Sequence, residues 1–204
     1  MNTEALRRIA KRAWGSEAAA DFTTYDGKAK AAFIIQNREH AKESVVACDR
    51  YYPLLDTDQQ DDGLGDPTFI PQFFSAVTGQ KMTEDQYYSV GERSVNLQRA
   101  IMAREGRFGR ENDTIGEFNF TDPIETEDGL IGLFNPDLEF PGKGDEVVIL
   151  KGKTMDRDAF ESMKDDYYQL RNWDVNSGLQ TEKCLEDLNL EFLCDDLKKL
   201  NALK

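Results

Sequence analysis

Histidine and cysteine are scarce in this chain, with one histidine, His40, and three cysteines among 204 residues. A single histidine cannot build a histidine-based catalytic triad or a multi-histidine metal site within the chain. The sequence also lacks a glycine-rich phosphate loop, a nucleophile elbow and a C-x-x-C pair. The standard catalytic constellations are therefore nearly absent.

Positive charge is also in short supply, because 25 Lys and Arg face 39 Asp and Glu, for a net charge of -14. A field of that sign repels phosphate backbones and anionic lipid headgroups, so nucleic acid and membrane surfaces are poor candidate partners. No apolar run approaches the length of a membrane span, and the N-terminus lacks a signal-peptide core. The odd, scattered cysteines argue against a disulfide framework. These features predict a cytoplasmic protein.

Helical periodicity dominates what is present, and the sequence predicts a mainly α fold. The clearest start signal is a capping box in which Thr83 precedes Gln86 by three residues. Glycines at positions 15, 79 and 106 are placed to end helices in left-handed caps. The predicted helices cover residues 1–15, 27–40, 67–79, 83–106, 156–170, 181–188 and 190–203.

Residues 107–155 differ in character, being rich in Gly, Pro, Asn and Asp with one β-like run, "EVVIL". They are interpreted as an irregular arm that wraps the helices and carries a small hairpin. We predict one helical domain over residues 1–204, in which 1–106 form the helical core, 107–155 the arm and 156–204 the terminal helices. The charged residues of the long helix, Glu92, Arg93, Arg99 and Arg104, are interpreted as helix-surface ion pairs.

Cys48 ends the stretch "KESVVAC" and has two interpretations. Composition alone favours a small buried hydrophobe, since cysteine is among the most buried residue types. The alternative is a ligand of a metal or an iron–sulfur cluster, which typically needs four thiolates. Cys184 and Cys194 lie far from Cys48 in the sequence. If Cys48 is a ligand, its companion ligands come from outside this chain.

Several stretches, in this order, resemble one family, the tungsten-containing aldehyde:ferredoxin oxidoreductases. "YDGKAKAAFIIQN" (25–37) fits the helix before that family's cysteine. "GERSVNLQRAIMAREG" (91–106) is similar to its G-E-R-x-x-N-L-x-R…R-E-G helix. "ENDTIGEF" (111–118) resembles the D-D-x-L-P-E-x segment that follows, and residues 163–190 resemble the ending Y-Y-x-x-R-G-W-D…L-x-x-L-G-L. The resemblance implies the C-terminal helical domain of a longer polypeptide.

The family motif D-x-x-G-L-C corresponds to "ESVVAC", residues 43–48. The resemblance implies that Cys48 is one ligand of a [4Fe–4S] cluster and that Glu43 and the Ala47 backbone contact a tungsten-bis-pterin. The other three thiolates then belong to an upstream domain or subunit. The implied enzyme oxidises aldehydes to carboxylic acids with ferredoxin as electron acceptor, as a homo- or hetero-oligomer. The isolated chain is expected to be inactive.

Some positions depart from the family pattern. Glu43 replaces Asp, and Val46 and Ala47 replace Gly and Leu, which puts a glycine-dependent backbone contact in question. Asn172 stands for the Gly of R-G-W-D. Residues 118–160 look closer to the tungsten subunit of class II benzoyl-CoA reductases. That branch, and a non-catalytic helical interaction remnant, stay open as alternatives.

Overall fold

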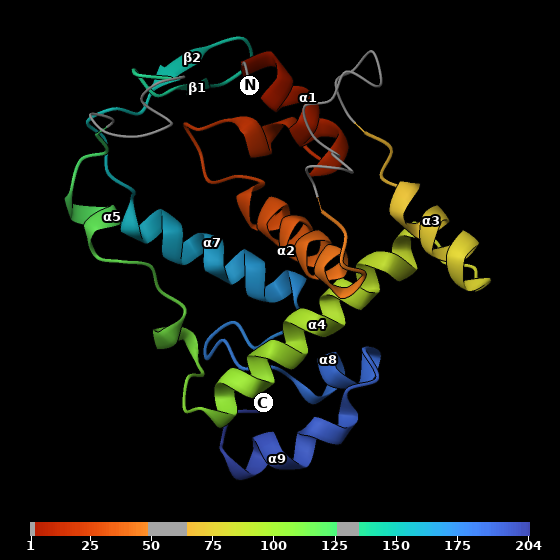
Figure 1. The fold of residues 1–204 in the computed structure, drawn as a ribbon. Coiled ribbons are helices and arrows are strands. Elements are labelled where there is room, and N and C mark those ends of the chain that lie inside the picture. The colour runs from red at the N-terminus through yellow and green to blue at the C-terminus, as the bar shows by residue number, and fades with distance from the viewer. Residues whose placement is uncertain (1–2, 49–64, 126–134) are drawn as a thin grey trace. The chain divides into compact units, whose positions relative to one another are not determined.

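The computed structural model describes residues 3–48, 65–125 and 135–204. Helices make up most of the described chain, and the one sheet there is an antiparallel hairpin of β1 (Glu139–Pro141) and β2 (Val147–Ile149). Figure 1 shows the hairpin and the helices as ribbons. The predicted mainly α class with a small hairpin is confirmed. Within the described part of the chain, no helix combines the length and apolar character needed to cross a bilayer.

The chain divides into two compact units, each assembled from two segments. The first comprises Met1–Ala31 and Thr114–Tyr167, and the second comprises Ala32–Asp113 and Tyr168–Lys204. The predicted organisation into a core, an arm and terminal helices is not tested by this division and stays a prediction.

The first unit is built on small residues and on a lysine that ties a loop to a helix. Ala10, Ala19, Ala20 and Ala31 pack together, with Trp14 against them. The Nζ of Lys28 donates to the carbonyl oxygens of Ala19 and Asp21, at 2.7 Å each. The helices of this unit are α1 (Thr3–Ala13), η1 (Glu17–Ala20), the start of α2 (Lys28–Ser44), α5 (Phe118–Thr121) and most of α7 (Arg157–Leu170).

The second unit is organised around α4 (Glu84–Arg104), which begins at the predicted capping box. Thr83 accepts from the Gln86 amide, and the Gln86 side chain accepts from the Thr83 amide. Gly91 lets α2 approach closely, because a Cβ there would lie 1.8 Å from the Asn37 carbonyl oxygen. The other helices of this unit are α3 (Phe69–Thr78), η2 (Arg110–Asn112), α8 (Glu182–Asp187), η3 (Glu191–Leu193) and α9 (Cys194–Lys199).

Two predicted helix ends are wrong. The helix predicted over 27–40 runs on to Ser44, since no glycine or proline interrupts it and Ala41 and Lys42 are buried. The helix predicted over 190–203 is instead the short η3 followed by α9, which ends at Lys199. Asn201 then adopts a left-handed conformation, with φ of 56°, that stops the helix.

Candidate functional site

The end of α2 leads directly to Cys48 and has a defined backbone geometry. The Ala47 amide donates to the Lys42 carbonyl at 3.1 Å, and the Val46 amide donates to the Glu43 carbonyl at 3.1 Å. This pair of bonds, with a left-handed residue at Val46, is a Schellman motif. The motif fixes the direction in which the chain leaves the helix toward Cys48.

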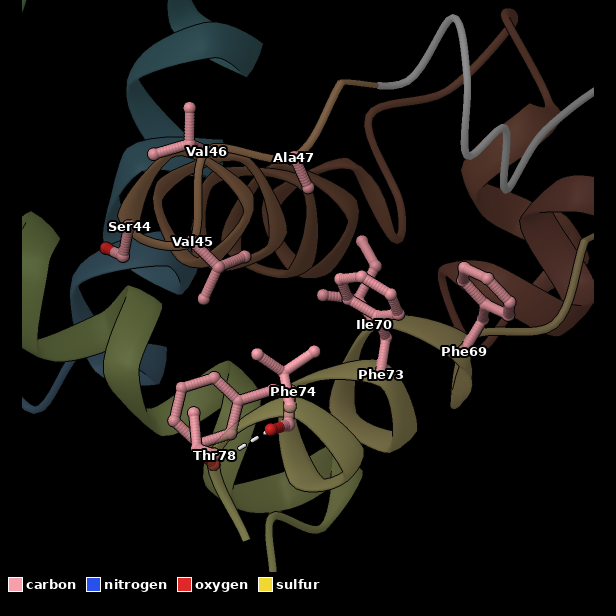
Figure 2. A pocket seen from close by; sticks show the side chains of 10 residues that line it. Ser44, Val45, Val46, Ala47, Phe69, Ile70, Phe73, Phe74 and Thr78 are labelled. Atoms are coloured by element: carbon pink, nitrogen blue, oxygen red, sulfur yellow. Dashed lines mark hydrogen bonds between the residues drawn. The ribbon is translucent and has the colours of Figure 1, made fainter. Parts of the chain in front are cut away.

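Val46 carries the left-handed conformation of that motif, with φ of 56°. A β-branched residue is rarely found there, because its side chain crowds the backbone. Val46 is 91% exposed, and its side chain points away from α3 (Figure 2). Val46 therefore holds a left-handed backbone conformation at the cost of local strain.

A pocket of about 370 Å³ lies between the end of α2 and the face of α3. Phe69, Phe73 and Val77 recur along one stripe of α3 and are 45%, 55% and 69% exposed. Val45 points from the end of α2 toward this helix (Figure 2). The lining is mainly apolar: Ser44, Val45, Val46, Ala47, Phe69, Ile70, Phe73, Phe74, Val77 and Thr78.

Cys48 follows the pocket-lining residue Ala47 and is exposed. Its exposure contradicts the interpretation of Cys48 as a buried hydrophobe. Glu43, one turn earlier, is also exposed, and its carboxylate lies 4.0 Å from the Lys42 ammonium. The three residues singled out by the motif thus lie within one short segment, in which Ala47 lines the pocket.

The other two cysteines are buried in the second unit. Burial, with the nearby Glu92 carboxylate, raises the pKa of the Cys184 thiol to about 11. Burial also raises the pKa of the Cys194 thiol. The Cys184 Sγ lies 3.5 Å from Oδ1 of Asn96, to which it donates. Both thiols are therefore protonated near neutral pH and have structural surroundings.

Because Cys48 is exposed and the other two cysteines are buried, we expect thiol-specific reagents to react selectively with Cys48. Since the thiolate is the nucleophile, a thiol with a pKa near 11 is only about one part in a thousand reactive at pH 8. We expect iodoacetamide to label native protein once, at Cys48, and at least about tenfold faster than the other two cysteines. Peptide mass spectrometry gives the sites and rates, with protein in denaturant as the three-label control. Equal labelling of native Cys184 and Cys48 would contradict this contrast.

The interior of the second unit holds polar residues whose importance the sequence did not reveal. Asn96 is fully buried and accepts from the indole nitrogen of Trp173 at 2.9 Å and from the Gln180 amide at 2.7 Å. Arg99, predicted to lie on the surface, stacks 4.1 Å from the Trp173 ring centre and forms a bidentate pair with Asp113. The surface interpretation of Arg99 is wrong, because α4 buries this face against the segment after α7.

Glu92 is another residue of α4 predicted as a surface ion pair. It is only partly exposed, and burial raises the pKa of its carboxyl group, partly offset by the Arg171 charge. The residue spacing within α4 does not predict the partners of Asn96, Arg99 and Glu92, because those partners lie outside the helix.

Comparison with known proteins identifies the family to which this helical chain belongs. Residues 4–190 match the family model described as aldehyde ferredoxin oxidoreductase, domains 2 and 3. The chain therefore belongs to the aldehyde ferredoxin oxidoreductase family, as the sequence motifs indicated.

A solved structure shares the fold. It is the active-site complex BamBC of benzoyl coenzyme A reductase in complex with 1,5-dienoyl-CoA. The TM-score is 0.56 at 17% sequence identity, over 87% of this chain and 21% of the other. The chain thus spans about a fifth of the length of that relative, and the likeness concerns the fold alone.

Proposed function

We propose that this chain supplies one thiolate, that of Cys48, to a [4Fe–4S] cluster shared with another polypeptide. The enzyme so formed oxidises aldehydes to carboxylic acids. The observation that carries the proposal is the exposed Cys48 at the end of α2, beside a 370 Å³ apolar pocket, in a chain of this family.

The ligands in this chain fit a shared cluster better than a self-contained one. A [4Fe–4S] cluster is held by four cysteine thiolates. Among the described residues, no group of three or more His, Cys, Asp or Glu is gathered to hold a metal ion. Cys184 and Cys194 are buried with raised pKa values, so neither is prepared to act as a thiolate. Three further thiolates from an upstream domain or subunit would complete the site.

The residues beside Cys48 also fit a pterin cofactor. The Ala47 amide is engaged by the Lys42 carbonyl, so Ala47 offers a ligand its own carbonyl oxygen, an acceptor for pterin N–H groups. Glu43 adds an exposed carboxylate, which accepts hydrogen bonds of the stronger, charge-assisted kind. The apolar pocket wall would exclude water from this side of the cofactor.

The bound tungsten-bis-pterin would accept the two electrons released when an aldehyde and water become a carboxylic acid and two protons, and the cluster would pass them singly to ferredoxin. This chain's part is to hold the cluster through Cys48, to orient the pterin through Glu43 and Ala47, and to keep the pocket dry. Desolvation and hydrogen bonds near a cluster set its reduction potential.

Two other functions compete with this one. A role in a benzoyl-CoA reductase-like enzyme is favoured by the character of residues 118–160 and by the fold shared with the BamBC complex. A non-catalytic interaction domain is the third candidate. Activity of the assembled enzyme with an aldehyde and ferredoxin, or with an aromatic CoA thioester, separates the first two.

Metal content tests the proposal directly. We expect the purified 204-residue chain, treated anaerobically with iron and sulfide, to retain no stoichiometric cluster. When it is produced together with the upstream polypeptide that carries the missing cysteines, we expect about four irons and four sulfides per complex, with tungsten. A tight cluster in the isolated chain, or a metal-free complex, would contradict a shared site.

A further inference from the structure

Arg171 follows α7 and is fully buried, with 0% of its surface exposed. One guanidinium nitrogen donates to Oδ1 of Asn37 at 2.5 Å, and another donates to Oε1 of Gln36 at 3.0 Å. The guanidinium carbon lies 4.3 Å from the centre of the Phe33 ring. These three partners lie within about one helical turn, so a single side chain contacts one short stretch of α2.

The same segment of α2 is fixed from a second direction. Gly91 of α4 lies against the Asn37 carbonyl and the Ala41 amide, where a Cβ would come within 1.8 and 3.0 Å. Arg171 holds the Asn37 side chain while Gly91 packs against its backbone. About two turns further on, α2 ends in the Schellman motif before Cys48. A rotation or slide of the gripped turn would therefore be transmitted along the rigid helix to the thiol.

Burying the Arg171 guanidinium costs desolvation free energy that a purely apolar contact would avoid. A buried guanidinium loses its hydration, and the oxygens of Asn37 and Gln36 that accept from it are neutral amide oxygens. The half-buried Glu92 carboxylate supplies a nearby negative charge. A long apolar side chain would fill the space without that desolvation, whereas only arginine presents a planar fork to two acceptors. The Arg171 contacts therefore fix the position and orientation of α2 in addition to filling space.

We propose that Arg171 is a positioning residue, which fixes the rotation of α2 and so aims the Cys48 thiol. The effect on α2 follows from the contacts alone, and the effect on a cluster rests on the proposed function. The two parts can be measured separately.

Hydrogen exchange on the full chain tests the first part. In Arg171→Lys and Arg171→Met we expect amides of residues 36–44 to exchange at least about tenfold faster, beyond any change in global stability. Arg99→Met is the matched control, because Arg99 is also stacked on an aromatic ring and hydrogen bonded, but to Trp173 and Asp113. Arg99→Met should lower the stability of the second unit without selectively increasing exchange of the amides of residues 36–44.

The second part is read in the co-produced complex. We expect the Arg171 variants to keep iron but to shift the magnetic resonance signal and the potential of the reduced cluster, with Arg171→Lys closer to wild type. If both variants fail to fold, Gln36→Leu removes one acceptor at an exposed position and should increase exchange of the same amides to a smaller degree.

If exchange of the α2 amides rose no more in the Arg171 variants than in Arg99→Met, the positioning role of Arg171 would be overturned. So would a cluster signal unchanged in the Arg171 variants while α2 exchange has increased. A wild-type complex that holds no cluster would instead overturn the proposed function and leave the exchange result to decide the role of Arg171.

Discussion

Gly91→Ala is expected to disrupt the second unit, with a loss of at least about 3 kcal/mol of unfolding free energy. The added Cβ would lie 1.8 Å from the Asn37 carbonyl oxygen, 2.7 Å from its carbon and 3.0 Å from the Ala41 nitrogen. All three are backbone atoms of α2, so no side-chain rotation can relieve the overlap. Alanine favours a helix over glycine by only about 1 kcal/mol, which cannot compensate.

Chemical denaturation of the full chain measures this loss. Ser89→Ala is the matched control, because Ser89 is an exposed position of the same helix and the change should stay within about 0.5 kcal/mol. If Gly91→Ala unfolded at the same denaturant concentration as the wild type, the close approach of α2 and α4 would not exist as described.

Cys48→Ser is expected to separate the cluster from the fold. Cys48 is exposed, so the substitution should change the unfolding free energy by less than about 0.5 kcal/mol. In the complex with the upstream polypeptide, an alkoxide is a poor replacement for a thiolate at iron. The cluster should be lost or converted, and electron transfer to ferredoxin should stop.

Cys184→Ser is the opposite case. Its thiol is buried and donates to Asn96, so a polar replacement should destabilise the second unit by about 1 kcal/mol and leave the cluster intact. A protein in which Cys184→Ser, and not Cys48→Ser, abolished the cluster would reverse the assignment of the ligand.

The sequence was sufficient wherever a local signal determines the structure. The capping box at Thr83 and Gln86 was predicted, and both of its hydrogen bonds are present. Gly79 closes α3 with φ of 73°, as its position indicated. The β-like run at 146–150 contains β2. Each of these features depends on residues within a few positions of one another.

The end of α2 shows where local signals fail. The helix was expected to end near His40, yet it continues to Ser44 and stops at Val46. No residue preference predicts a left-handed valine, since the backbone there is imposed by the two hydrogen bonds to Lys42 and Glu43. A strained, exposed residue beside Cys48 is the kind of local conflict found at functional sites.

The interior partners of α4 could not be derived from the sequence for a different reason. Asn96 and Arg99 have the spacing of an ordinary amphipathic helix, and their partners lie far away along the chain. Arg171 directly follows α7 in the sequence, whereas its hydrogen bonds reach α2. A periodic pattern identifies a buried face but not which distant segment buries it.

The most direct test of the shared-cluster account is the iron content and the reduced-state magnetic resonance spectrum of the co-produced complex carrying Cys48→Ser. The account predicts that the [4Fe–4S] signal present in the wild-type complex is lost or replaced by that of a smaller cluster, with iron falling below about four atoms per complex. Cys184→Ser and Cys194→Ser should retain the wild-type signal. Four irons, an unchanged spectrum and normal turnover in Cys48→Ser would contradict the account.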